Sequence, residues 1–112
     1  MPNRKWIVNL SPEADEDLIE IWGYLAHEAS ERVANRQLRE IDAACARLKA
    51  WPYSGRSRDE LLAGMRSVPI PPYAMFYRIQ NDVVEIVRVL HGRRDIASIF
   101  ADNSTIKNRS DT

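Results

Sequence analysis

The residues best suited to chemistry lie near the end of the chain, in the run His91-Gly92-Arg93-Arg94-Asp95. A histidine can act as a general base near neutral pH, but it needs a partner that fixes its tautomer. The sequence offers Glu85 and Asp95 as that partner. The two arginines suit recognition of a phosphate or a carboxylate. In the structural alternative, Asp95 caps a short helix and an arginine pairs with an acidic helix.

The common catalytic and cofactor-binding motifs do not occur in the sequence. It contains no glycine-rich phosphate loop, no helical histidine pair for zinc, no Gly-x-Ser-x-Gly elbow and no dinucleotide-binding fingerprint. The single Cys45 has no second cysteine to pair with, and it falls on an apolar helical stripe, which favours a core position over a nucleophile. We therefore expect no cofactor and no metal.

Composition predicts one ordinary globular domain. The chain has 112 residues, of which 45% are hydrophobic and 29% charged. It lacks the apolar run of a signal peptide or a membrane span, so we expect a cytoplasmic protein that does not enter the membrane. The net charge is zero, but residues 13–31 carry acids and no base, whereas arginines dominate residues 32–100. This asymmetry suits an acidic partner, or arginines on a solvated face.

The spacing of apolar residues predicts an α+β domain with the order β-α-α-β-β-β. Strands are expected over residues 4–10, 65–70, 72–80 and 83–91, with a polar loop over residues 52–64. Ser11-Pro12 and Ser30 are expected to begin two antiparallel helices, the second ending before Trp51-Pro52. The acidic residues of the first helix should be solvated. A short helix over residues 94–100 and a frayed tail over residues 101–112 complete the expected domain.

The last two strands are expected to form a hairpin around Asn81-Asp82. A two-residue turn would pair Arg78 with Glu85 and Phe76 with Val87 on one face of a mainly antiparallel sheet. The helical hairpin should cover the other face. We therefore expect the face with Phe76 and Arg78 to be open and to bind a partner, although a homodimer or a folded-back tail would also cover it.

In this order the residues resemble the RelE/ParE superfamily of toxins from bacterial toxin–antitoxin modules, over about residues 4–100. The resemblance implies the same β-α-α-β-β-β fold and a cognate antitoxin as partner. The segments that carry it are Ser11-Pro12-Glu13-Ala14, Ile21-Trp22-Gly23-Tyr24-Leu25-Ala26, Gly64-Met65-Arg66-Ser67, and residues 55–61, 73–79 and 87–96.

The superfamily contains two mechanistic classes, and the resemblance favours one of them. RelE-like members are ribosome-dependent mRNA endonucleases, whose third-strand arginine and C-terminal tyrosine fall on Ala74 and Phe100 here. Arg94 and, if the protein is a nuclease, His91 would be the remaining catalytic candidates. ParE-like members inhibit DNA gyrase and typically carry the ending that residues 91–96 show. The resemblance thus implies a gyrase inhibitor that is not an enzyme, with an mRNA endonuclease as the alternative.

A set of basic and apolar residues is expected to contact the antitoxin or the target. The antitoxin would be ParD-like or related, would present an amphipathic segment with acidic residues, and would form a hetero-oligomer with the toxin. We expect no sequence-specific nucleic-acid binding by the toxin alone. The expected contact residues are Arg66, Phe76, Arg78, Arg88, His91, Arg93 and Arg94.

Overall fold

The computed structural model describes residues 6–101, which begin with the short edge strand β1 (Ile7–Leu10) and the helix α1 (Pro12–Glu28). The helix begins where the sequence predicts. The hydroxyl of Ser11 accepts a hydrogen bond from the amide of Ala14 at 3.0 Å, and Pro12 occupies the first helical position. A serine cap followed by proline satisfies a free amide at the helix start and fixes a helical φ.

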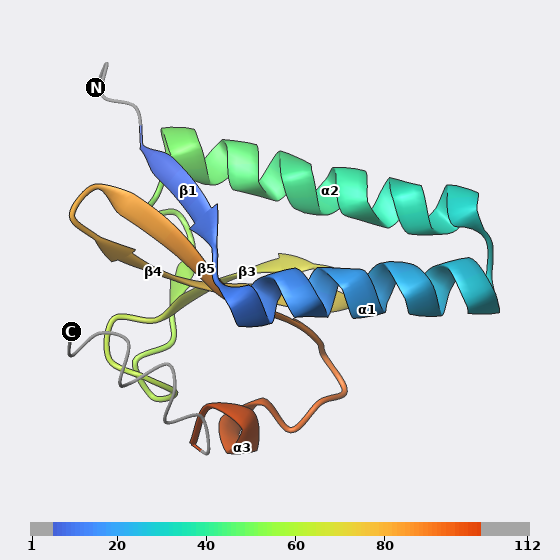
Figure 1. The fold of residues 1–112 in the computed structure, drawn as a ribbon. Coiled ribbons are helices and arrows are strands. Elements are labelled where there is room, and N and C mark those ends of the chain that lie inside the picture. The colour runs from blue at the N-terminus through green and yellow to red at the C-terminus, as the bar shows by residue number, and fades with distance from the viewer. Residues whose placement is uncertain (1–5, 102–112) are drawn as a thin grey trace.

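The second helix, α2 (Glu31–Ala50), lies antiparallel beside α1 (Figure 1). The hydroxyl of Ser30 accepts a hydrogen bond from the amide of Val33 at 3.1 Å and caps the helix as predicted. Ala34, Ile41, Ala44 and Leu48 are buried at helical spacing. None of the described helices is long and apolar enough to cross a bilayer.

The sheet has five strands in the order β1-β5-β4-β3-β2. The strands β2 (Arg56–Ser57), β3 (Arg66–Ile70), β4 (Tyr73–Gln80) and β5 (Val83–His91) pair antiparallel, and β1 pairs parallel with β5. The predicted α+β class is confirmed, and the predicted elements follow one another along the chain in the order β-α-α-β-β-β. The two-residue strand β2 was not predicted: it lies within residues 52–64, where the sequence analysis expected only a loop.

The predicted register of the β4–β5 hairpin is correct near the turn and wrong beyond it. Arg78 pairs with Glu85 as expected, but Phe76 pairs with Arg88 instead of Val87, because the register shifts by one residue in the middle of the hairpin. Such a bulge places two residues of one strand opposite one of the other. Both faces of these strands are apolar, so the residue pattern carries no signal for the shift.

The larger core lies between the sheet and the two long helices. Its strand residues include Met75, Tyr77, Val84, Ile86 and Val89, all buried. The half-buried Cys45 packs against this core, and burial raises the pKa of its thiol. The prediction that Cys45 belongs to the core is confirmed.

A second core covers the face that the sequence analysis expected to be open. Phe76 is 0% exposed, and its ring lies 5.2 Å from that of Phe100 in the short helix α3 (Ile96–Ala101), which lies across the sheet from α2 (Figure 1). The expectation of an open face is therefore wrong, and so is that of an accessible Phe76. The physical reason is that the chain folds back after β5 and covers its own apolar surface. The predicted frayed tail lies outside the described residues from residue 102 onward.

Candidate functional site

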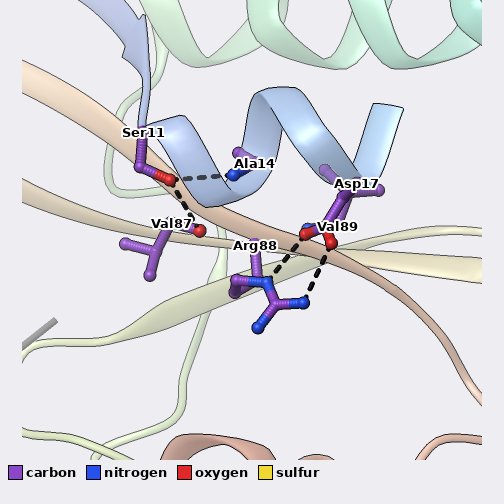
Figure 2. A network of polar contacts seen from close by, with 6 residues as sticks. All are labelled: Ser11, Ala14, Asp17, Val87, Arg88 and Val89. Carbon is purple, nitrogen blue, oxygen red and sulfur yellow. Dashed lines mark hydrogen bonds and ion pairs between the residues drawn. The ribbon is translucent and has the colours of Figure 1, made fainter. Parts of the chain in front are cut away.

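The first turns of α1 replace a missing neighbour strand along β5. The strand β1 pairs with β5 only as far as Ile86, whose carbonyl accepts a hydrogen bond from the amide of Ser11 at 2.9 Å. The hydroxyl of Ser11 donates to the carbonyl of Val87 at 2.9 Å, and the carboxylate of Asp17 accepts from the amide of Val89 at 2.9 Å (Figure 2). Ser11 and Asp17 therefore provide hydrogen-bond partners for backbone groups of β5 that have no neighbouring strand beyond the end of β1.

The carboxylate of Asp17 also binds Arg88 through two hydrogen bonds. Arg88 donates from Nε and an Nη atom at 2.8 and 2.9 Å, the two-pronged geometry of a strong arginine–carboxylate pair (Figure 2). The side chains are only 15% and 8% exposed, and the bond to Asp17 raises the pKa of Arg88. Arg88, one of the expected contact residues, is thus engaged inside the chain.

The sequence analysis missed Asp17, because it assigned all the acids of the first helix to the solvated face. That expectation is wrong for this residue. Asp17 lies three positions after Ala14 and four before Ile21, both of which are buried. Residues at these spacings share one face of a helix. The helical spacing therefore contained the signal for a buried acid.

Beyond this ion pair, α1 and the end of β5 enclose a groove of about 500 Å³. Three of the expected contact residues, His91, Arg93 and Arg94, lie along it. The opposite wall is formed by α1, including Tyr24, whose side chain is 63% exposed. The structure therefore brings together an exposed aromatic residue and the basic run that the sequence analysis singled out.

Hydrogen bonds fix the wall of the groove that carries the basic residues. The amide of Gly92 donates to the carbonyl of Pro72 at 2.9 Å, and the amide of Arg94 donates to the carbonyl of His91 at 3.0 Å. The His91 ring accepts a hydrogen bond at Nδ1 from the amide of Arg93 at 3.0 Å. In the neutral ring this interaction places the proton on Nε2.

Neither carboxylate proposed as a partner of His91 is available for that role. Asp95 accepts a hydrogen bond from the amide of Ser98 at 3.3 Å and so caps α3, as the structural alternative predicts. Glu85 lies near the other end of β5, where it pairs with Arg78 at 3.9 Å. Among residues 6–101 no cluster of side chains is suited to a metal ion.

The remaining expected contact residues lie outside the groove. Arg66 donates from an Nη atom to the carbonyls of Tyr53 and Gly55 at 3.1 and 2.7 Å and lies over the Tyr53 ring. Arg78 is 9% exposed and its Nε has no hydrogen-bond partner within the described structure. Together with Phe76, these arginines contribute to the construction of the sheet and its loops.

Comparisons with known proteins agree with this fold. Residues 8–96 match the family model described as the ParE toxin of the type II toxin–antitoxin system parDE. Toxin ParE3 of Caulobacter vibrioides is 33% identical over 82 residues, which cover 73% of this chain and 82% of the relative. Toxin ParE1 of Mycobacterium tuberculosis is 36% identical over 88 residues, which cover 78% of this chain and 90% of the relative.

Solved structures share the architecture. The chromosomal ParDE system from P. aeruginosa contains a chain that superposes with a TM-score of 0.69 at 17% identity, over 78% of this chain and 96% of that one. The toxin–antitoxin complex RelBE2 from Mycobacterium tuberculosis contains one with a TM-score of 0.57 at 25% identity, over 79% and 99%. The fold is therefore that of the RelE/ParE superfamily. Within it, the chain belongs to the ParE toxin family of type II toxin–antitoxin systems.

Proposed function

We propose that this ParE-type toxin inhibits DNA gyrase as a bound protein, without breaking bonds itself, and that a cognate ParD-like antitoxin neutralises it. The observation that carries the proposal is the ParE family match over residues 8–96, which includes the ParE-like ending at residues 91–96. That ending lies on the rim of the groove, where Arg93 and Arg94 are exposed.

The surroundings of the positions that matter in RelE-like nucleases support an inhibitor over an enzyme. Phe100 replaces the C-terminal tyrosine, and it is 2% exposed and packed against Phe76. A side chain buried in this way has no free face on which an RNA base could stack. Ala74 replaces the third-strand arginine and carries no charge to stabilise a phosphate.

The groove provides only part of what RNA cleavage would require. Attack by a 2′-hydroxyl needs a base, an acid and cations around the phosphate. His91 and Arg94 lie along one groove, which is the observation in favour of the nuclease alternative. However, the Nδ1 atom of His91 is occupied by the amide of Arg93, which leaves one nitrogen for two proton transfers. The inhibitor is therefore the better-supported function.

An antitoxin partner is supported by the nature of the solved relatives. The P. aeruginosa structure is of a ParDE toxin–antitoxin system, and the M. tuberculosis structure is of a toxin–antitoxin complex. A toxin of this family requires such a partner to be harmless to the cell that makes it. We therefore propose a toxin–antitoxin hetero-oligomer in the cytoplasm, where gyrase and its DNA are also found.

The purified protein should be tested on gyrase and on translated message in parallel. Increasing amounts should reduce supercoiling and accumulate cleaved DNA, and addition of the co-expressed antitoxin should restore supercoiling. Primer extension on message in a translation reaction should show no new cuts. Unchanged gyrase activity at high toxin excess, together with codon-positioned cuts in the message, would replace the proposal with the nuclease alternative.

A further inference from the structure

The end of α2 and the turn that follows it carry exposed aromatic and basic side chains. Residues 43–58 include four basic residues and no acidic one. Within this stretch Trp51 is 70% and Tyr53 60% exposed, and the side chains of Arg47, Lys49 and Arg56 are exposed as well. We refer to these five residues as the aromatic–basic surface. None of them lines the groove beside α1.

The turn that carries the two exposed rings is held from inside the protein. The amide of Ser54 donates to the carbonyl of Trp51 at 3.1 Å, which closes the turn. The buried hydroxyl of Tyr77 donates to the carbonyl of Pro52 and accepts from the amide of Gly55, so both sides of the turn are tied to β4. The rings are therefore presented on a fixed backbone, and a ligand does not have to order it.

The ring of Tyr53 is oriented by two neighbours. The guanidinium of Arg66 lies 5.2 Å from the ring centroid, and the same side chain donates to the carbonyl of Tyr53 at 3.1 Å. The ring of Trp6 approaches edge-on, with the two centroids 6.1 Å apart, where the end of α2 lies beside β1 (Figure 1). More than half of the tyrosine remains exposed, which leaves room for a planar ligand to stack on it.

The fold explains part of this surface and leaves part of it unexplained. Cations in the last turn of a helix complement its dipole, which accounts for Arg47 and Lys49. A tryptophan that is 70% exposed buries little of its apolar area, so Trp51 contributes little to the stability of the core. No salt bridge within residues 6–101 engages the basic side chains of the surface. Exposed rings beside free cations indicate a ligand outside the chain.

The combination of rings and cations matches one class of ligand. Proteins bind single-stranded nucleic acid without reading its sequence by placing cations along the phosphates and aromatic rings against the unpaired bases. The two acids that follow the surface, Asp59 and Glu60, are engaged by hydrogen bonds within their own loop. Asp59 also lines a hollow beside Tyr53, where its charge disfavours a phosphate. The phosphates are therefore expected beside Arg47 and Lys49.

We propose that the aromatic–basic surface binds single-stranded DNA without sequence preference. Unpaired bases stack on Trp51 and Tyr53, and the neighbouring phosphates lie against the three basic side chains. This goes beyond inhibition of gyrase, which does not require the toxin to contact DNA. The choice of DNA over RNA rests on the proposed function, because the proposed target acts on DNA.

The test measures the affinity of the full-length protein for a fluorescein-labelled oligothymidine of about twelve nucleotides, by fluorescence polarisation at low salt. Trp51→Ala with Tyr53→Ala should weaken binding by about tenfold or more, because two stacking platforms are lost. Phenylalanine at both positions keeps the rings and should restore most of the affinity. Arg47→Ala with Lys49→Ala should also weaken binding. These two changes should reduce the slope of log affinity against log salt by about 0.7 for each lost phosphate contact.

Matched controls remove similar side chains elsewhere. Tyr24→Ala removes an exposed ring of α1, and Arg36→Ala with Arg39→Ala removes two exposed arginines of α2. Both controls should bind the oligothymidine as the wild type does. Equal affinities of the wild type and the Trp51→Ala, Tyr53→Ala protein, with melting temperatures preserved, would overturn the proposal.

Other ligands distinguish stacking from attraction between charges. Duplex DNA has the higher charge density, so a surface that acts through charge alone would prefer it, whereas exposed rings prefer unpaired bases. The oligothymidine should therefore bind about tenfold more tightly than a duplex of the same length. Polyglutamate should displace it only weakly, since it has no bases to stack. A preference for the duplex or for polyglutamate would overturn the proposal, and an oligouridine RNA bound tenfold more tightly would overturn the assignment to DNA.

The gyrase assay keeps this proposal separate from the proposed function. If the wild-type protein binds the oligothymidine through Trp51 and Tyr53 but leaves gyrase unaffected, the proposed function fails and the binding surface stands. If the protein inhibits gyrase but does not bind the oligothymidine, the binding surface fails and the proposed function stands. The two results come from different measurements on the same preparations.

Discussion

Three arginines, one in β5 and two in the segment that follows it, have different surroundings. Arg88 lies inside the chain in a two-pronged pair with Asp17, whereas Arg93 and Arg94 lie exposed along a groove. The residue type is the same, and only a few positions separate them. The difference arises because α1 carries a buried carboxylate opposite Arg88, and no ion pair within residues 6–101 engages the other two. What the fold places opposite a charged side chain decides whether that side chain is structural or available.

The largest effect should come from removing the carboxylate that defines this difference. Asp17→Ala leaves Arg88 without its counter-ion and the amide of Val89 without an acceptor, in a part of the molecule where water is scarce. We expect a loss of about 3 to 5 kcal/mol in the free energy of unfolding, measured by urea denaturation. Asp15→Ala, which removes an exposed acid of the same helix, should change it by less than about 0.5 kcal/mol.

A double variant shows whether stability depends on having two charges at these positions, or only on leaving neither charge buried without its partner. Asp17→Leu with Arg88→Met replaces both partners by apolar side chains, and it should be more stable than Asp17→Ala alone. The amide of Val89 stays unpaired in both variants, so any recovery reports on Arg88. Equal stabilities of the Asp17→Ala and Asp15→Ala proteins would show that Arg88 does not depend on this carboxylate.

Local signals in the sequence were sufficient for the starts of the two long helices and for the hairpin turn. Ser11-Pro12 and Ser30 begin the helices because a serine hydroxyl satisfies a free amide, wherever the helix later packs. Asn81 and Asp82 form the hairpin turn with φ of 51° and 67°, values that these residue types tolerate. Such choices depend on neighbours in sequence, so they can be predicted without the fold.

Features that depend on distant neighbours could not be predicted in the same way. The strands β4 and β5 carry apolar residues on both faces of the sheet. The hydrophobic pattern therefore fits the register with the bulge as well as the register without it. The groove joins Tyr24 to Arg93, which lie far apart in sequence. The cover over Phe76 comes from Phe100, whose apolar helix is too short to have a distinctive pattern.

Tyr77 and Tyr24 differ in the same way as the arginines, one buried and one exposed, and we expect smaller changes in the free energy of unfolding. The hydroxyl of Tyr77 is buried, donates to the carbonyl of Pro52 at 2.8 Å and accepts from the amide of Gly55 at 2.9 Å. Tyr77→Phe leaves both backbone groups without this partner and should lower the free energy of unfolding by about 1 to 3 kcal/mol. Tyr24→Phe, at an exposed hydroxyl, should be neutral in the same denaturation experiment. Equal losses for the two variants would contradict this contrast.

The loss of stability at alkaline pH gives an independent test of the burial of the Tyr77 hydroxyl. Burial raises the pKa of its hydroxyl, so the folded protein keeps this proton at pH values where the unfolded chain has lost it. The contribution is fully present at pH values well below about 10, the pKa of an unfolded tyrosine, and it is lost as the pH rises through that value toward the higher pKa of the folded state. Stability measured between pH 9 and 11 should therefore fall less steeply in the Tyr77→Phe protein, and equal slopes would contradict the assignment.

The helix caps differ in a similar way. Ser11 caps α1 and also donates to the carbonyl of Val87 on β5, whereas the hydroxyl of Ser30 caps α2 through the amide of Val33. Ser11→Ala should cost about 1 to 2 kcal/mol, and Ser30→Ala about 1 kcal/mol or less. Thermal unfolding of the two variants measures the difference. A Ser30→Ala protein that melts below Ser11→Ala would mean that the bond to Val87 contributes nothing.

The smallest effect on stability is expected where the effect on binding is expected to be largest. Arg93→Ala and Arg94→Ala remove side chains that are exposed, so the free energy of unfolding should change by less than about 0.5 kcal/mol each. Arg88→Ala leaves Asp17 buried without its partner and should cost several times more. If Arg93→Ala instead destabilises the protein as strongly as Arg88→Ala, its guanidinium belongs to the fold. The groove would then have lost the free charge on which recognition of an acidic segment depends.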